Sequence, residues 1–129
     1  MGELRRHEAL PVVLIVESNR SLASLISSVL GREGYSVVVA NAAEEAIEIC
    51  AELANIDLLI TDVFLPGASG IDLANQVSQH HPESKILFLS SITEEALRKH
   101  GIKDGADVLP KPIALSDLIV HVNQLMHGT

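Results

Sequence analysis

Four polar side chains with complementary chemistry each stand at, or just after, the end of an apolar segment. Two neighbouring carboxylates repel each other and attract a cation such as Mg²⁺, which proteins hold through one or two carboxylates. An aspartate can attack phosphorus, and a lysine, a hydroxyl and a metal stabilise the charge on a transferring phosphoryl group. The set therefore predicts phosphoryl acceptance rather than hydride or acyl transfer. Its members are Glu17, Asp62, Ser90 and Lys111.

These side chains can meet only if the segments that carry them fold side by side. Continuous apolar runs predict buried strands, whereas apolar residues three and four positions apart predict helices. The two patterns alternate strictly along the chain. Strands are expected at 12–16, 35–40, 57–62, 85–90 and 106–109, each followed by a helix with apolar residues within 22–30, 43–53, 71–77, 96–97 and 115–126.

Five strand–helix units in alternation predict an α/β fold with a single doubly wound five-stranded parallel sheet and helices on both faces. The length of the chain fits the flavodoxin-like strand order 2-1-3-4-5. In such folds ligands bind beyond the carboxyl ends of the strands, where the strand order reverses. Glu17 and Asp62 end the first and third strands on either side of that point, and Ser90 and Lys111 follow from the fourth and fifth.

Local signals predict where the helices begin. Ser18 or Asn19, then Asn41 and later Thr93, have the short polar side chains that cap helix amino termini. The segment 63–70 contains one proline and two glycines and is expected to be a loop.

Composition limits the classes of function. The chain has 129 residues, 47% of them hydrophobic, which is enough for one packed domain. A formal charge of -8 argues against direct binding of nucleic acid, because such binding neutralises phosphates with lysine and arginine. No apolar run is long enough to cross a membrane, and residues 1–10 lack the apolar core of a signal peptide. The lone Cys50 lies on an apolar helix stripe, where packing explains it. We expect a cytoplasmic protein.

Other phosphate-binding chemistries lack their sequence parts. Glu17 is followed by Ser-Asn-Arg, which is neither a glycine-rich dinucleotide motif nor a P-loop. A flavodoxin-like enzyme or cofactor carrier is another hypothesis for this fold, although the phosphate loop and flanking aromatic residues expected of a flavin site are not evident. Structural roles also stay open for single residues: Asp62 could begin a loop by bonding nearby amides, and Ser90 could cap the next helix.

Four short motifs occur in a specific order and spacing, although each is weak alone. They are Glu17 after the first strand; Leu59-Ile60-Thr61-Asp62 with Leu65-Pro66 and Gly70; Phe88-Leu89-Ser90-Ser91; and Gly105-Ala106-Asp107 with Lys111-Pro112. Over roughly residues 12–126 the chain resembles the receiver domain of two-component response regulators, and is similar to the single-domain chemotaxis regulator. We therefore expect an N-terminal arm at 1–11 and a receiver domain at 12–127.

The resemblance implies a role for each residue of the set. Asp62 would accept a phosphoryl group from a sensor histidine kinase or a phosphotransfer protein, so the chain would be a signalling domain and not an enzyme. Lys111 would pair with Asp62 and then with the phosphoryl group, whose oxygen Ser90 would contact. Glu17, Asp62 and the backbone carbonyl of Phe64 would hold Mg²⁺. Phosphorylation would then switch a surface that binds a downstream protein or an output domain following this chain.

The sequence departs from the family pattern at the metal ligands and at the signal readout. The family's second acid, its direct metal ligand, is Ser18 here, so we expect weak Mg²⁺ binding. Glu17 is one methylene longer than aspartate, and we hypothesise that it reaches the metal. Val108 and Ile113 replace aromatic residues, whereas the Lys111–Pro112 bond is expected to be cis, as is usual in the family. The alternative function is an atypical receiver, a phosphorylation-independent protein-interaction module.

Overall fold

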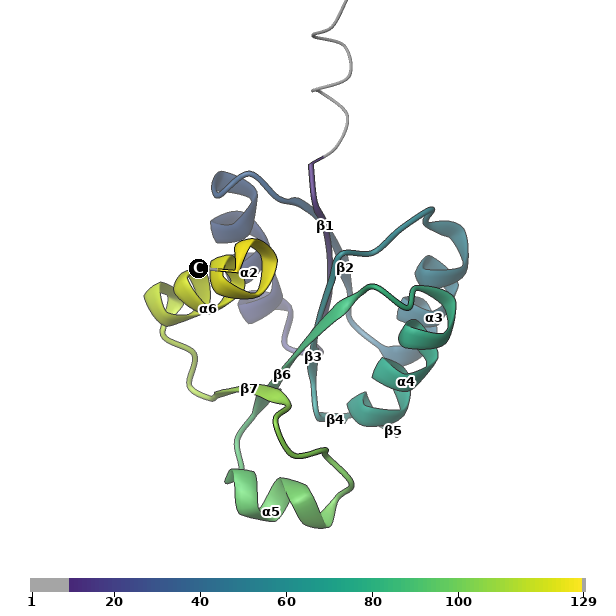
Figure 1. Cartoon of the computed structure of the whole chain (residues 1–129), viewed down its shortest axis with the longest axis vertical. Helices are drawn as coiled ribbons and strands as arrows, with labels where there is room; N and C mark the ends of the chain where they lie inside the picture. The colour runs from purple at the N-terminus through teal and green to yellow at the C-terminus, as the bar shows by residue number, and fades with distance from the viewer. Residues whose placement is uncertain (1–9, 129) are drawn as a thin grey trace, which may run out of the picture.

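The computed structural model describes residues 10–128, which form one parallel sheet between two layers of helices (Figure 1). The strand order is β2-β1-β3-β6-β7, and every neighbouring pair is parallel. This confirms the predicted doubly wound order, because these are the five sheet strands in the sequence order 2-1-3-4-5. The strands are β1 (Val12–Val16), β2 (Ser36–Ala40), β3 (Leu58–Asp62), β6 (Lys85–Ser90) and β7 (Asp107–Pro110).

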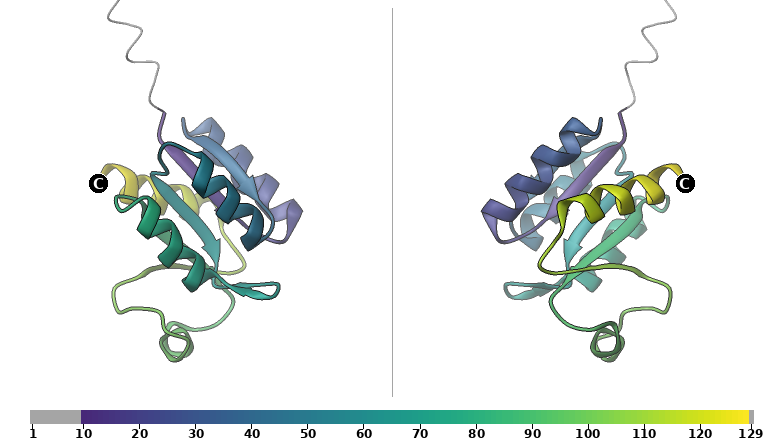
Figure 2. Two further views of the ribbon diagram at one scale, coloured as in Figure 1. Left: turned by 90° about the vertical axis from the view of Figure 1, so that its right-hand side faces the viewer. Right: turned by 90° about the vertical axis from the view of Figure 1, so that its left-hand side faces the viewer.

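Helices cover both faces of the sheet, as the alternation of strands and helices predicts (Figures 1 and 2). On one face lie α2 (Arg20–Arg32) and α6 (Leu115–His127), and on the other lie α3 (Ala43–Glu52) and α4 (Gly70–His80). The short α5 (Glu94–Lys99) lies beyond the carboxyl ends of the strands, at the bottom of Figure 1. The four candidate residues stand at, or directly after, the carboxyl ends of β1, β3, β6 and β7, so they belong to this same edge of the sheet.

An apolar core on each face holds the sheet to its helices. All five residues of β3 are buried, and so are four of the five in β1. Alternate residues of a strand point to opposite faces, so Val13 and Ile15 join one core and Leu14 and Val16 join the other. Burial of each such aliphatic side chain contributes about 1.5–3 kcal/mol to folding. Cys50 is buried within the core beneath α3, as its place on the apolar stripe predicts.

The side-chain caps of the helices agree only in part with the sequence analysis. The side chains of Asn19 and Thr93 cap α2 and α5, as predicted. Asn41 was expected to cap α3 but does not, because that helix begins one residue later, after Ala42. The Asn41 side chain instead donates a hydrogen bond to the backbone carbonyl of Glu17, at 3.1 Å. It therefore ties the end of β1 to the connection that leads into α3.

The segment 63–70, expected to be a loop, contains a small antiparallel hairpin. Its strands are β4 (Phe64–Leu65) and β5 (Ala68–Ser69), and Gly67 in the turn has a φ of 68°, which glycine adopts without strain. Strands of two residues are too short to show an alternating pattern, so the sequence analysis missed them. The hairpin follows Asp62 directly and lies at the carboxyl edge of the sheet (Figure 1).

Two further expectations from the sequence concern membrane-spanning helices and the N-terminal arm. Across residues 10–128 none of the helices combines the length and the apolar character that a membrane crossing requires. The predicted arm at 1–11 falls almost wholly outside the described residues.

Candidate functional site

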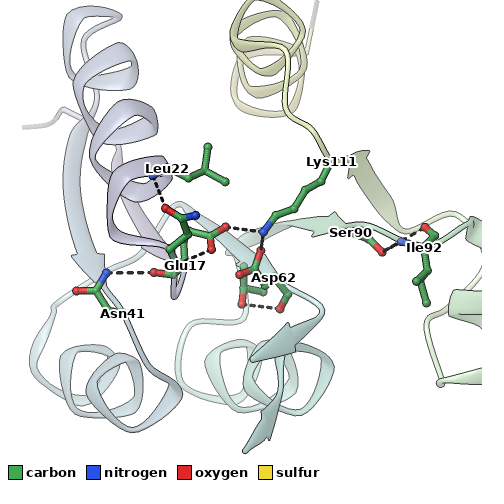
Figure 3. A network of polar contacts seen from close by, with 9 residues as sticks. Glu17, Leu22, Asn41, Asp62, Ser90, Ile92 and Lys111 are labelled. Atoms are coloured by element: carbon green, nitrogen blue, oxygen red, sulfur yellow. Dashed lines mark hydrogen bonds and ion pairs between the residues drawn. The ribbon is translucent and has the colours of Figure 1, made fainter. Parts of the chain in front are cut away.

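Three of the four predicted side chains meet at the carboxyl edge of the sheet (Figure 3). Glu17 directly follows β1, Asp62 ends β3 and Lys111 directly follows β7. The Nζ atom of Lys111 lies 2.9 Å from Oε1 of Glu17 and 2.8 Å from Oδ1 of Asp62. One ammonium group therefore bridges two carboxylates that come from neighbouring strands.

Main-chain groups of other residues hold both the amide and the carboxylate of Glu17. Its amide donates to the carbonyl of Ala40 at 3.1 Å, which extends the pairing of β1 with β2 by one residue. Its Oε2 atom accepts a hydrogen bond from the amide of Asn19 at 2.9 Å. Asn19 in turn caps α2 by accepting from the amide of Leu22 at 3.0 Å. The start of α2 therefore fixes the carboxylate of Glu17, which is 1% exposed.

Asp62 is held by its place in the central strand and by a close backbone approach. It pairs with Leu89 of β6, and the next amide, that of Val63, donates to the Leu89 carbonyl at 3.1 Å. The carbonyl of Val63 accepts from the amide of Gly70 at 2.7 Å. A Cβ atom at Gly70 would overlap the carbonyl oxygen of Asp62, so only glycine fits there. The start of α4 thereby supports the backbone of Asp62.

Lys111 reaches the site because its backbone is tied to β6. Its amide donates to the carbonyl of Ser90 at 2.8 Å, and its peptide bond to Pro112 is cis, as expected. The Lys111 side chain is 24% exposed, whereas the two carboxylates that it contacts are buried. The ammonium thus lies at the partly open mouth of the site, with the acids beneath it.

Burial and mutual contact shift the pKa values of the charged groups in this site. Burial raises the pKa of Asp62 to about 6, and Glu17 adds to this rise while Lys111 opposes it. Burial by itself lowers the pKa of Lys111, but the two carboxylates outweigh burial and keep its pKa above the ordinary value. With all three groups ionised the site carries one net negative charge. Such a site attracts a cation, and its aspartate is strongly perturbed, as is common at functional sites.

Ser90 is not brought into contact with the other three residues. Its hydroxyl accepts from the amide of Ile92 at 3.0 Å and lies 3.2 Å from the carbonyl of the same residue, so it closes a local turn (Figure 3). The cap of the following helix α5 is Thr93, so the structural alternative for Ser90 as the helix cap is wrong. The Ser90 side chain points away from Asp62 in this structure.

The remaining candidate metal ligands differ in their surroundings. Ser18 is exposed to solvent. Phe64 is the first residue of β4, and its half-exposed ring packs edge-on against His100, with 5.0 Å between the ring centroids. The acids present fit Mg²⁺ by chemical type, because Glu17 and Asp62 supply the one or two carboxylates that this ion uses. Across residues 10–128, however, no three histidine, cysteine or acidic side chains are grouped as metal ligands.

Sequence reasoning named Gly70 and Asn41 but missed the contacts by which they position this site. The contact of Gly70 with the Asp62 backbone depends on how α4 approaches β3, and only the presence of a glycine hinted at it. The bond from Asn41 to Glu17 joins residues that are 24 positions apart, and no local pattern signals it.

Known proteins resemble this chain in sequence. The family model of the response regulator receiver domain matches residues 13–123. The transcriptional regulatory protein CpxR of Escherichia coli (strain K12) is 33% identical over 115 residues, which is 88% of this chain and 48% of CpxR. The chain thus spans about half the length of the curated relatives it matches.

Solved structures give the same result. A receiver domain from the hybrid histidine kinase CckA is 31% identical with a TM-score of 0.75, and the match covers 90% of this chain and 99% of that one. A response regulator from Thermotoga maritima is 27% identical with a TM-score of 0.78, over 92% of this chain and 98% of that one. Receiver domains are phosphoacceptor signalling domains, and they generally bind Mg²⁺ at an acidic pocket. By sequence and by fold, this chain belongs to the receiver domain family of two-component response regulators.

Proposed function

We propose that this chain accepts a phosphoryl group on Asp62 from a sensor histidine kinase or a phosphotransfer protein, and that phosphorylation switches a protein-interaction surface. One observation carries the proposal: the ammonium of Lys111 lies 2.8 Å from Asp62 and 2.9 Å from Glu17, at the edge where the strand order reverses. A buried aspartate beside a fixed cation is suited to attack phosphorus and to hold the charged product.

The proposed step exchanges one phosphorus bond for another. An oxygen of Asp62 attacks the phosphorus of a phosphohistidine, an O–P bond forms, and the P–N bond breaks as its electron pair returns to the imidazole. Lys111 then turns from the Asp62 oxygen to a phosphoryl oxygen, while Glu17 keeps its anchor on the Asn19 amide. Mg²⁺, held by Glu17, Asp62 and the Phe64 carbonyl, would neutralise charge on the phosphoryl group.

Ser90 has a role only after transfer. Its hydroxyl bonds to the main chain of Ile92 before phosphorylation. A phosphoryl oxygen on Asp62 is a stronger acceptor than the Ile92 carbonyl, so the hydroxyl is expected to turn toward it. That rotation removes the bonds that hold the turn leading into α5. The change in charge at Asp62 would thereby reach a helix beyond the carboxyl edge.

The experiment is phosphorylation by a small phosphodonor such as acetyl phosphate, with Mg²⁺ and with a chelator. We expect a labile acyl-phosphate on the wild-type chain and none on Asp62→Asn. The matched control is Asp72→Asn, which removes an exposed acid from the first turn of α4 and is expected to be phosphorylated like the wild type. Equal incorporation into Asp62→Asn would show that the acceptor lies elsewhere.

The second candidate function is a receiver that works without phosphorylation, as a constitutive protein-interaction module. Two observations favour it: Ser18 stands in place of an acid, and Lys111 already occupies the facing oxygens of both carboxylates. Binding of a partner with equal affinity by wild type and by Asp62→Asn, in the presence of phosphodonor, would select this candidate over the first.

The wider setting follows from the same proposal. Relatives such as CpxR are about twice the length of this chain and are named as transcriptional regulators. We infer that this chain acts through an output domain or through a separate downstream protein. We also infer that it works in the cytoplasm, as a domain at 12–127, with no direct contact to nucleic acid or membrane.

A further inference from the structure

The face of the sheet that α3 and α4 cover is left partly open over its last two strands, β6 and β7. The helix that connects these strands is α5, which lies beyond their carboxyl ends rather than along them (Figure 1). The six residues of α5 span about 9 Å, whereas the six residues of β6 span about 20 Å. Parallel strands are normally covered along both faces, so among residues 10–128 this part of the sheet lacks a helix of matching length.

A groove of about 390 Å³ lies at this place, between α4 and the connection 101–107. Its volume falls within the range of about 300–1,000 Å³ that is typical of ligand pockets. On α4 its wall includes the uncharged side chains of Asn75 and Ser78. The apolar lining belongs to the core on this face or packs against it, and consists of Ile71, Ala74, Ile86, Phe88, Ile102 and Ala106. The three isoleucines are only half-buried, so the groove exposes apolar surface that a partner can cover.

The charges around the groove favour an acidic partner. Both acids that line it have a basic neighbour: Asp104 lies 3.3 Å from Arg98, and Asp107 lies 3.4 Å from Nε2 of His121. Lys103 also lines the groove, is exposed and forms no ion pair among residues 10–128. The chain carries a formal charge of -8, yet three of its nine lysines and arginines lie within 98–103. A carboxylate approaching this rim therefore meets a positive charge that is not already neutralised.

We propose that this groove binds an acidic amphipathic helix of a partner protein, with apolar side chains on the isoleucines and a carboxylate on Lys103. A helix lying along β6 supplies the cover that α5 is too short to give, and such helices bind grooves through apolar residues at helical spacing. The groove lies on the opposite face of the sheet from α6, whose buried residues belong to the other core. The inference rests on the proposed function in one respect, because the partner is the downstream protein or output domain that the proposed function requires.

The experiment is titration of the full chain with a designed peptide of about 15 residues, which has leucines at helical spacing on one face and glutamates beside them. Binding is measured by the fluorescence anisotropy of a dye on the peptide, and its place by NMR of the isoleucine methyl groups. We expect the signals of Ile71, Ile86 and Ile102 to move, while those of Ile26 and Ile60, buried in the other core, stay in place. A peptide with lysines in place of the glutamates is expected to bind at least about fivefold more weakly.

Two pairs of variants test the apolar and the charged part of the groove separately, after circular dichroism has shown that each variant is folded. Ser78→Trp fills the groove from α4 and is expected to abolish binding, whereas Gln79→Trp, one position along and outside the groove, is expected to bind like wild type. Lys103→Glu is expected to bind the glutamate peptide at least about fivefold more weakly than wild type, and the lysine peptide more tightly. Its control, Arg32→Glu, reverses an exposed charge at the end of α2 on the other face and is expected to change neither affinity.

Three results would overturn the proposal. The first is that the methyl signals of the groove isoleucines stay in place at millimolar glutamate peptide. The second is that wild type and a folded Lys103→Glu chain bind both peptides equally. The third is that the groove is already filled, either by α5, seen as NMR contacts between Ala96 and Ile86, or by a second copy of the chain, seen by sedimentation.

The acyl-phosphate assay separates this inference from the proposed function. Binding of the glutamate peptide in the groove by a chain that never takes up phosphate would refute the proposed function and leave the docking site standing. Phosphorylation of Asp62 in a chain that does not bind the peptide would overturn the docking site alone.

Discussion

Replacing Asp62 with asparagine is expected to stabilise the fold, although this residue lies at the centre of the site. The wild-type site holds two buried carboxylates against one ammonium, and the neutral amide removes the excess charge while it still accepts a hydrogen bond. Burial, with the contribution of Glu17, raises the pKa of Asp62 from 3.8 to about 6. Functional sites commonly carry such a cost in stability.

The sign and size of the effect follow from proton linkage. The folded chain holds the Asp62 proton to a higher pH than the unfolded chain does, so the free energy of unfolding falls most steeply between about pH 4 and pH 6 and levels off by about pH 7. A shift from 3.8 to about 6 corresponds to about 3 kcal/mol in total. About 2 kcal/mol of that loss falls between roughly pH 4.5 and pH 7.5. Asp62→Asn lacks this loss, so its advantage over wild type grows with pH over that range.

The assay is urea unfolding followed by far-ultraviolet circular dichroism, because the chain has no tryptophan and a single tyrosine. Wild type, Asp62→Asn and the exposed-acid control Asp72→Asn are compared at several pH values in the presence of a chelator. Each variant differs from wild type only in the exchanged acid, so its difference from wild type isolates that acid. An Asp62→Asn chain less stable than wild type at neutral pH, or a difference that does not vary with pH, would refute the reasoning.

Further substitutions test how the site and the fold are held. Gly70→Ala places a methyl group on the Asp62 carbonyl and is expected to destabilise the chain by about 3 kcal/mol or more, with slower phosphorylation. Gly31→Ala, in α2, meets no heavy atom within 4 Å among the described residues and is expected to stabilise by about 0.5–1 kcal/mol; a loss would contradict the backbone seen there. Tyr35→Phe removes the hydrogen bond that the buried hydroxyl donates to Asn123 at 2.6 Å and is expected to cost about 1 kcal/mol in urea unfolding, whereas no cost would mean that solvent replaces the bond.

At position 108 the chain departs from the aromatic residue expected of the family. Val108 is half-buried against the apolar core on the face of the sheet that α3 and α4 cover, and it pairs in register with Phe88 of β6. No aromatic ring on β7 can therefore follow the Ser90 hydroxyl. The edge-on contact of Phe64 with His100 is a contact between the hairpin after Asp62 and the end of α5.

The sequence alone was sufficient to predict the fold and the edge of the sheet at which Glu17 and Asp62 meet. Buried parallel strands have continuous apolar runs, as in β1 and β3, and their alternation with amphipathic helices allows few topologies. Parallel strands place their carboxyl ends at one edge, so the meeting of Glu17 and Asp62 could be predicted without coordinates. Asn19 and Thr93 were predicted as caps because capping depends on a few adjacent residues.

Only the tertiary structure decided how the side chains are oriented and shared. The bridging position of Lys111, the bond of Asn41 to Glu17 and the fit of Gly70 against Asp62 join segments that are distant in sequence. The hydroxyl of Ser90 faces Ile92 rather than Asp62, a choice between rotamers that residue type does not determine. The physical reason is range: hydrophobic pattern and capping act within a few residues, whereas ion pairs and steric fit depend on atoms that come together only when the whole chain has packed.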